Sequence, residues 1–167
     1  RLRWLRQHSG RLRLVVANAS TPHLLAWHQQ LVPALVELMQ QHPRLQLDLL
    51  GSVPLAAPLE PFRQRIRCRG HSDFSTYLQR LAEADIGLMV LEPGPFTDAK
   101  SPNRWMECSL MGLATVLSPI RSCTDLLEHG VHTRFASQPQ DWVEQINQLL
   151  RHPRQRLQLV QQAQQLA

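Results

Sequence analysis

Short runs of aliphatic and β-branched residues alternate along the chain with segments whose apolar positions recur every three or four residues. The short runs are typical of buried strands, and the spaced positions are typical of helices that pack on a core. The pattern predicts strands at residues 11–17, 45–50, 65–69, 86–91, 114–118 and 132–136. It predicts helices at residues 24–42, 74–82, 102–111, 141–150 and 153–166, with a helical turn at 125–129. Pro33 must kink or restart the first helix, because proline lacks a backbone N–H.

Strands that alternate with helices along a chain form repeated βαβ units. We therefore predict an α/β fold with a single doubly wound (Rossmann-like) parallel sheet and helices on both faces. Ser72 is expected to cap the helix at 74–82. In such sheets ligands bind beyond the carboxyl ends of the strands, where the strand order reverses. The loops at that edge would be residues 18–23, 51–60, 70–73, 92–101 and 118–124.

Composition agrees with one globular domain. The chain has 167 residues, of which 43% are apolar and 19% charged, and these values exclude a disordered tail, a collagen-like repeat and a coiled coil. A formal net charge of +5 favours anionic partners. Lys100 is the only lysine among 18 basic residues, which singles it out for attention.

Cys68, Cys108 and Cys123 form neither an even set nor a CxxC pair. This argues against a disulfide framework and against a thiolate zinc site. The histidines show no HxxxH spacing, so we expect no metal site. No apolar run reaches the roughly 18 to 20 residues of a membrane-spanning helix. A reducing compartment and a cytoplasmic location are therefore expected.

The chain begins at Arg1 without a methionine, which suggests an excised domain or a fragment of a longer protein. Residues 1–10 are interpreted as a linker or as the end of a missing preceding domain, and residues 11–167 as the domain itself. The basic residues of the opening segment would also suit peripheral contact with an anionic membrane, although such binding usually takes a longer amphipathic face.

Arg63, Arg65, Arg67 and Arg69 alternate along the third predicted strand and would project from one side of it. Such a row suits nucleic acid, but no stacking aromatic residues accompany it. At the edge of a doubly wound sheet, charges of this kind discourage unwanted strand pairing. We therefore expect an edge strand and no nucleic-acid partner.

Several well-known site motifs are absent from the sequence. There is no GxGxxG dinucleotide fingerprint, no GxxxxGK[ST] phosphate loop and no GxSxG nucleophile turn. These absences argue against a standard dinucleotide site, a P-loop enzyme and a hydrolase of the nucleophile-elbow design.

The candidate site is the segment around a predicted helix start at Ser101 and Pro102, where a hydroxyl can cap and a proline fits the first position. Lys100 and Arg104 then lie at the positive end of the helix dipole, where a cation is disfavoured by roughly 0.3 to 1 kcal/mol. A bound diphosphate would offset this unfavourable interaction, because its negative charge would be stabilised by the free N–H groups, the helix dipole and both cations.

Glu107 follows Arg104 by three residues, on the same face of the predicted helix and about 4.5 Å further along its axis. Its carboxylate can accept hydrogen bonds from a ribose diol while phosphates stay at the helix start. The alternative is an exposed helix with an Arg104–Glu107 ion pair that contributes roughly a few tenths of a kcal/mol.

The segment Lys100-Ser101-x-x-Arg104-x-x-Glu107, followed by Gly112 and by Ala-Thr-Val-Leu-Ser at 114–118, resembles the donor-binding segment of the group 1 (family 4) glycosyltransferases. Residues 20–23, 33–35 and 42–51 resemble the first βαβ unit of these enzymes, and residues 70–71 and 81–88 resemble a later stretch. The chain is thus similar to the carboxyl-terminal, nucleotide-sugar-binding half of the two-domain B-type (GT-B) fold.

The resemblance implies a retaining transferase that takes a sugar from a nucleotide diphosphate sugar, such as a UDP- or GDP-sugar, without a resident cofactor. It places Glu107 at the second glutamate of an E-x7-E pair, whose role in the family is to hold the ribose. The first glutamate would fall at Ala99 and is missing. The acceptor site and any catalytic residue would belong to a missing amino-terminal domain, so we expect the isolated chain to transfer nothing.

Three further residues are candidates for donor binding. Ser20 and Thr21 stand where the family usually has a glycine-rich loop, and they either donate to a phosphate or cap the following helix. His71 follows a predicted strand and either approaches a base or sugar or is simply solvated.

Two other functions remain open from the sequence. A catalytically silent nucleotide-binding or interaction module is suggested by Ala99 in place of a glutamate. A fragment of a sugar-nucleotide 2-epimerase would share the two-domain architecture, but it would be expected to carry further acidic and histidine residues in its donor half.

Overall fold

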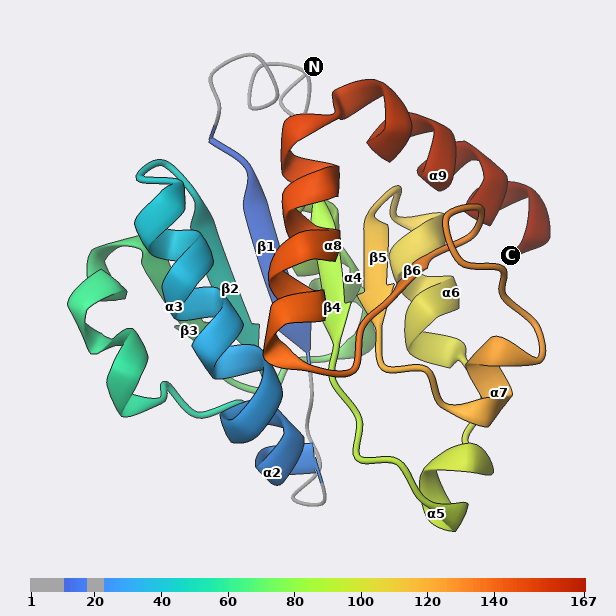
Figure 1. The fold of residues 1–167 in the computed structure, drawn as a ribbon, viewed down its shortest axis with the longest axis horizontal. Coiled ribbons are helices and arrows are strands. Elements are labelled where there is room, and N and C mark those ends of the chain that lie inside the picture. The colour runs from blue at the N-terminus through green and yellow to red at the C-terminus, as the bar shows by residue number, and fades with distance from the viewer. Residues whose placement is uncertain (1–10, 18–22) are drawn as a thin grey trace.

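The computed structural model describes residues 11–17 and 23–167. These residues form a six-stranded parallel sheet in the order β3-β2-β1-β4-β5-β6 (Figure 1). The strands are β1 (Arg13–Ala17), β2 (Gln46–Leu50), β3 (Ile66–Arg69), β4 (Ile86–Met89), β5 (Ala114–Leu117) and β6 (Arg134–Phe135). The predicted doubly wound α/β fold is confirmed, whereas the interpretation of residues 1–10 falls outside the described residues.

Helices cover both faces of the sheet. They are α2 (Leu24–Ala26), the π-helical η2 (Trp27–Leu31), α3 (Val32–Gln41), the 3₁₀-helical η3 (Ala57–Arg65), α4 (Phe74–Ala82), α5 (Pro95–Asp98), α6 (Asn103–Leu110), α7 (Arg121–Thr124), α8 (Pro139–Arg151) and α9 (Pro153–Leu166). Helices α3 and α8 lie on one face of the sheet, and α4 and α6 lie on the other (Figure 1).

The strand order reverses between β1 and β4. From β1 the chain moves outward to β2 and β3 and then returns to place β4 on the other side of β1. In register, Leu14 of β1 lies between Leu47 of β2 and Ile86 of β4. The edge of the sheet beyond the carboxyl ends of β1 and β4 is therefore the switch point at which such folds bind ligands.

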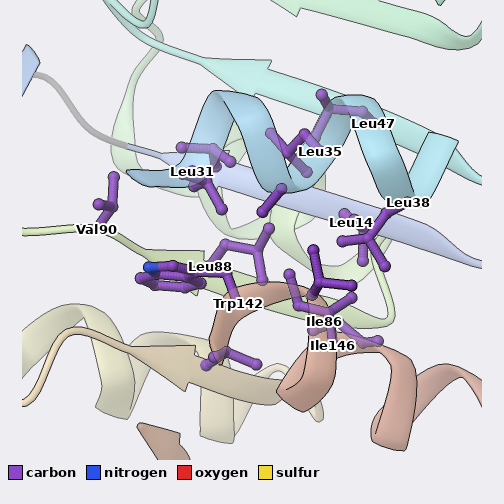
Figure 2. Close-up of a cluster of buried hydrophobic side chains, with 14 of the residues drawn as sticks. Leu14, Leu31, Leu35, Leu38, Leu47, Ile86, Leu88, Val90, Trp142 and Ile146 are labelled. Carbon is purple, nitrogen blue, oxygen red and sulfur yellow. The ribbon is translucent and has the colours of Figure 1, made fainter. Parts of the chain in front are cut away.

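The larger hydrophobic core lies between the sheet and the helices α3 and α8 (Figure 2). Leu14 and Ile86 from the strands meet Leu35 of α3 and Ile146 of α8, and Trp142 of α8 packs beside them with no exposed surface. Burying each such side chain contributes about 1.5 to 3 kcal/mol. This packing holds the strands rigidly beneath the loops at their carboxyl ends.

The other face of β2 carries a buried carboxylate. Asp48 has no exposed surface and accepts hydrogen bonds from Arg13 (2.5 Å) and from Arg67 (2.8 Å). Arg67 and Arg69 also donate to Glu83, at the end of α4, each over 2.8 Å. These pairs compensate the cost of removing Asp48 from water, which for an unpaired ion is several kcal/mol.

The predicted row of four arginines on one side of β3 is confirmed only for Arg67 and Arg69, and the position of β3 at the edge of the sheet is confirmed. Arg63 lies exposed in η3, and Arg65 turns to the end of α3. Arg67 and Arg69 form the ion pairs on the α4 side. The acidic partners lie far away in the sequence, which is why alternation along the strand did not indicate them.

Several predicted boundaries also differ. The predicted loop at 51–60 runs into η3, the loop at 92–101 contains α5, and the helical turn after Ile120 is at α7 rather than at 125–129. Asp73, and not Ser72, caps α4, since its side chain accepts the Thr76 N–H over 2.9 Å. The expectation for Pro33 is confirmed, because the helix passes through η2 and restarts as α3 with this proline in its first turn.

Candidate functional site

A cavity of about 260 Å³ opens beyond the carboxyl ends of β4 and β5, against the start of α6. We call it the β4/β5 cavity. Its lining consists of His23, Met89, Leu91, Lys100, Ser101, Pro102, Asn103, Arg104, Trp105, Leu117, Ile120 and Cys123. Three residues that the sequence predicted as phosphate ligands, Lys100, Ser101 and Arg104, are thus brought together at one site.

A second cavity of about 250 Å³ lies beyond the ends of β1, β2 and β3 and is called the β2/β3 cavity. Its lining consists of Ala17, Leu50, Gly51, Gly70, His71, Ser72, Phe74, Tyr77, Arg80 and Arg104. Arg104 lines both cavities, so the two cavities share this residue.

Helix α6 begins one residue later than predicted. Its N-cap is Pro102, whose side chain has no acceptor atom for the first N–H groups. The prediction that Ser101 caps this helix is therefore wrong. The N–H groups of a first helical turn have no partner within the helix. Because Pro102 and Asn103 line the β4/β5 cavity, this uncapped helix start borders it.

Lys100 occupies a defined position at the cavity. Its Nζ lies 4.7 Å from the centre of the Phe96 ring, which is a cation–π distance, and 2.9 Å from Nε2 of His23. His23 is 2% exposed, and its Nδ1 accepts the Glu92 backbone N–H over 3.2 Å. Burial, and then the positive charge of Lys100, lower the pKa of His23 below its ordinary value.

Arg104 is held by an aromatic residue of α4. Its Nη1 donates to the Tyr77 hydroxyl over 2.7 Å, and that hydroxyl donates to Oε2 of Glu107 over 2.9 Å. Arg104 and Glu107 also approach within 3.9 Å of one another. Burial raises the pKa of Tyr77, so its hydroxyl keeps its proton. The phenol therefore joins the cation and the carboxylate in one hydrogen-bonded chain.

Electrostatically, the β4/β5 cavity suits an anion. Among its described lining residues, Lys100 and Arg104 carry formal charge, and none is a carboxylate. Cys123 also lines it, but burial raises the pKa of its thiol, which makes a thiolate nucleophile unfavourable. Across residues 11–17 and 23–167, no three His, Cys, Asp or Glu side chains gather in a way that would hold a metal ion.

The other predicted site residues are distributed differently. Glu107 lines neither of the two cavities and instead accepts from Tyr77. His71 lines the β2/β3 cavity, and its Nε2 lies 2.7 Å from the Ser52 hydroxyl. Ser20 and Thr21 lie outside the described residues. Their roles as donor ligands stay predictions.

Ala99, where a glutamate was expected, is exposed at the end of α5. The neighbouring Asp98 has a structural partner, because its Oδ1 accepts the Arg121 backbone N–H at the start of α7 over 3.0 Å. This bond ties the segment that carries Lys100 to α7.

Two site residues were missed in the sequence. His23 lies beside Lys100 although the two are 77 residues apart in the chain, and its one sequence signal was its place just after the first strand. Tyr77 falls at the helical spacing of the apolar residues in its segment, and that spacing indicates a core position and not a site residue. Its hydroxyl, an unusual group on such a stripe, was the available signal.

No helix among the described residues is both long enough and apolar enough to cross a membrane. A comparison with curated protein sequences finds no match. Among solved structures, the chain is similar to HepE of Anabaena in complex with UDP, with 19% identity, a TM-score of 0.72, and coverage of 99% of this chain and 47% of HepE. The chain thus spans about half the length of that protein.

Two other structures are similar over most of the chain. The carboxyl-terminal domain of the group 1 glycosyl transferase LpcC from Francisella tularensis has 10% identity and a TM-score of 0.69, covering 93% of this chain and 83% of that one. A putative UDP-N-acetylglucosamine 2-epimerase from Listeria monocytogenes has 14% identity and a TM-score of 0.70, covering 96% and 42%. At these identities the likeness shows the fold.

The family model described as glycosyl transferase-like matches residues 29–167, which is most of the chain. The matched range contains all the described lining residues of the two cavities except Ala17, at the end of β1, and His23. The chain therefore belongs to the glycosyl transferase-like family.

Proposed function

We propose that this chain is the donor-binding half of a retaining glycosyltransferase and that it binds the nucleoside diphosphate part of a nucleotide sugar. The observation that carries the proposal is the meeting of Lys100 and Arg104 in a cavity whose described lining residues include no carboxylate, beside the uncapped start of α6. Two cations and free N–H groups at a helix start are a strong combination for a diphosphate.

In this proposal the diphosphate lies in the β4/β5 cavity, with Lys100, Ser101 and Arg104 as its ligands. The cations and N–H groups stabilise the negative charge that develops on the nucleoside diphosphate as the bond to the sugar breaks. They are already in place, so little reorganisation accompanies that step. No cofactor is needed, because the nucleotide sugar is itself the substrate.

The nucleoside would extend from Arg104 toward the β2/β3 cavity, where Phe74 offers an exposed aromatic face and His71 lies near. Glu107 would hold the ribose, as the family resemblance implies. Its carboxylate accepts the hydrogen bond of the Tyr77 hydroxyl at Oε2, and because a carboxylate has about four acceptor positions, capacity for a ribose diol remains.

Membership of the glycosyl transferase-like family supports this proposal, as does the likeness to HepE, which was solved with UDP and with UDP-glucose. Retention of configuration follows from the resemblance to the group 1 enzymes. The acceptor, and any catalytic group that acts on it, would belong to an amino-terminal domain, in keeping with the 47% of HepE that the chain covers.

Isothermal titration calorimetry with UDP and GDP tests the proposal. We expect binding by the unchanged chain, and losses of about tenfold or more in Lys100→Gln and Arg104→Gln, because hydrogen bonds to charged groups contribute about 1.5 to 3 kcal/mol. Glu107→Ala should also bind more weakly. Arg121→Gln is a matched control, since that side chain is 79% exposed on the neighbouring α7. Absence of binding to both nucleotides, or equal affinity in all variants, would overturn the proposal.

A silent nucleotide-binding module is the second candidate, and the exposed Ala99 in place of the first glutamate favours it. An epimerase fragment has less support, because no carboxylate lines the described part of the β4/β5 cavity. Assaying sugar transfer and nucleotide-sugar hydrolysis with the full-length protein separates these functions. A transferase releases the nucleoside diphosphate, a silent module releases none, and an epimerase changes the sugar configuration.

A further inference from the structure

His23 lies between two hydrogen-bond donors. The Glu92 backbone N–H points at Nδ1 over 3.2 Å, and the Lys100 amine stands 2.9 Å from Nε2 on the opposite side of the ring. The ring is 2% exposed, so water does not replace either neighbour freely. Each contact places a hydrogen-bond donor against a ring nitrogen, and each therefore requires a lone pair on that nitrogen.

A neutral imidazole has one lone pair and one N–H, and an imidazolium has two N–H groups and no lone pair. Whichever nitrogen of His23 carries the proton, one of the two contacts brings two donors together. The backbone N–H of Glu92 is fixed and requires an acceptor, whereas the Lys100 side chain has rotatable bonds and can turn. The proton of His23 therefore belongs on Nε2, which faces Lys100 and the cavity.

The surroundings keep this ring neutral. Lys100 precedes α6, and Arg104 lies on it, and both are cationic. The thiol of Cys123 comes from α7, and β4 and β5 contribute apolar side chains to the lining. Glu92, whose backbone N–H contacts the ring, is not among the residues that line the β4/β5 cavity, so its carboxylate does not add negative charge to that lining. Burial and the charge of Lys100 both lower the pKa of the imidazole.

An Nε2–H facing an ammonium at 2.9 Å is an arrangement that lacks an acceptor. An anionic oxygen in the β4/β5 cavity would supply it, because one oxygen can accept from both groups at once. Such an oxygen would remove the conflict between the two donors.

We propose that His23 is a neutral hydrogen-bond donor to the diphosphate, locked with its proton on Nε2 by the Glu92 backbone N–H, and that it shares one phosphate oxygen with Lys100. This inference rests on the proposed function, since the diphosphate is its ligand. His23 is thereby a binding residue of the site, and Glu92 acts through its backbone as the group that orients it.

Two substitutions separate the two nitrogens of the ring. His23→Asn keeps an oxygen near the position of Nδ1 for the Glu92 N–H but leaves nothing at Nε2. His23→Gln reaches the position of Nε2 with an amide N–H but leaves the Glu92 N–H without its acceptor. If His23 has only a structural role, UDP affinity should survive the Asn substitution at least as well as the Gln substitution. If Nε2 binds the anion, UDP affinity should survive only the Gln substitution.

The test combines UDP titration with nitrogen NMR of the imidazole. We expect His23→Asn to bind UDP about tenfold or more weakly than the unchanged chain, and His23→Gln to retain most of the affinity. The His23 signals, identified by their loss in the variants, should show the Nε2–H tautomer at neutral pH and should shift when UDP is added. Thermal unfolding of both variants accompanies the titrations, so that only folded protein is compared.

The outcomes distinguish the two proposals. If UDP binds the unchanged chain but His23→Asn binds it equally well, or if the His23 nitrogen signals show Nδ1–H, the role of His23 is overturned and the proposed function stands. If UDP and GDP fail to bind the unchanged chain, the proposed function falls and this inference falls with it.

Discussion

The guanidinium of Arg104 lies 5.2 Å from the centre of the Tyr77 ring and donates a 2.7 Å hydrogen bond to the hydroxyl of the same residue. That hydroxyl donates a 2.9 Å hydrogen bond to Oε2 of Glu107. Tyr77 comes from α4, whereas Arg104 and Glu107 come from α6. A single phenol therefore orients two of the proposed donor ligands from a neighbouring helix.

Tyr77→Phe should loosen this arrangement while keeping the ring. The loss of the hydroxyl removes one acceptor from Arg104 and one donor from Glu107, so we expect UDP affinity to fall by about two- to tenfold and the free energy of unfolding to fall by about 1 kcal/mol. Calorimetry and urea unfolding measure the two effects. Ser75→Ala, an exposed change on the same helix, should alter neither. Unchanged affinity in Tyr77→Phe would show that the phenol does not position the site.

Gly87→Ala is expected to destabilise the sheet where it meets α6. A Cβ at this position would lie 2.8 Å from Sγ of Cys108, on a helix packed against β4, and overpacking of this kind costs about 1 to 3 kcal/mol. The double variant with Cys108→Ala should recover part of that loss, because the obstructing sulfur is gone. Urea unfolding of both single variants and of the double variant measures the coupling. Strict additivity would show that the contact with sulfur is not the cause.

Arg65→Lys tests the anchor at the end of α3. The guanidinium of Arg65 donates to the carbonyl oxygens of Met39 (2.7 Å), His42 (2.9 Å) and Leu45 (3.3 Å). A lysine has the charge but not the planar fork, so we expect a loss of about 1 to 3 kcal/mol in the free energy of unfolding.

Arg63→Lys is the matched control for this anchor. Arg63 has a side chain that is 68% exposed and a distant pair with Glu60 at 3.6 Å, so its change should stay within about 0.5 kcal/mol. Equal effects of the Arg63 and Arg65 substitutions would contradict the role of the carbonyl bonds.

Stability should fall as the pH falls below about 6.5. Burial lowers the pKa of both His23 and His129 from 6.5, with Lys100 and Arg134 respectively adding to the effect. In that range the unfolded chain binds more protons than the folded one, so folding is favoured less as the solution becomes more acidic. Urea unfolding at pH 7.5 and 5.5 measures the slope. His129→Asn, whose amide oxygen can still accept the Phe135 N–H, should show a smaller slope, and a steeper one would contradict this assignment.

The sequence predicted the fold well because its elements have regular periods. In α4, apolar residues at 74, 77, 78 and 81 recur at helical spacing, and the observed helix has the predicted bounds. The 3₁₀ helix η3 escaped prediction, because it contains two prolines and does not follow the 3.6-residue period. Pro102 similarly displaced the N-cap of α6 by one residue from Ser101.

The site was only partly predictable, because some of its residues come from segments that are far apart in the sequence. Lys100, Ser101 and Arg104 are close in the chain, so their meeting at one cavity followed from a local helix start. His23, at the start of α2, contacts Lys100, and Tyr77 of α4 contacts Arg104, and only the folded sheet brings these distant segments together.

Because Arg104 borders both the β4/β5 and the β2/β3 cavities, we expect a ligand in one of them to change the binding free energy of a ligand in the other. A molecule long enough to occupy both gains from tethering, since its second half meets the guanidinium at a high effective concentration. Unlinked fragments, one anionic and one aromatic, would not have this advantage. We therefore expect the shared arginine to favour ligands that are long enough to occupy both cavities, as well as ligands that carry negative charge.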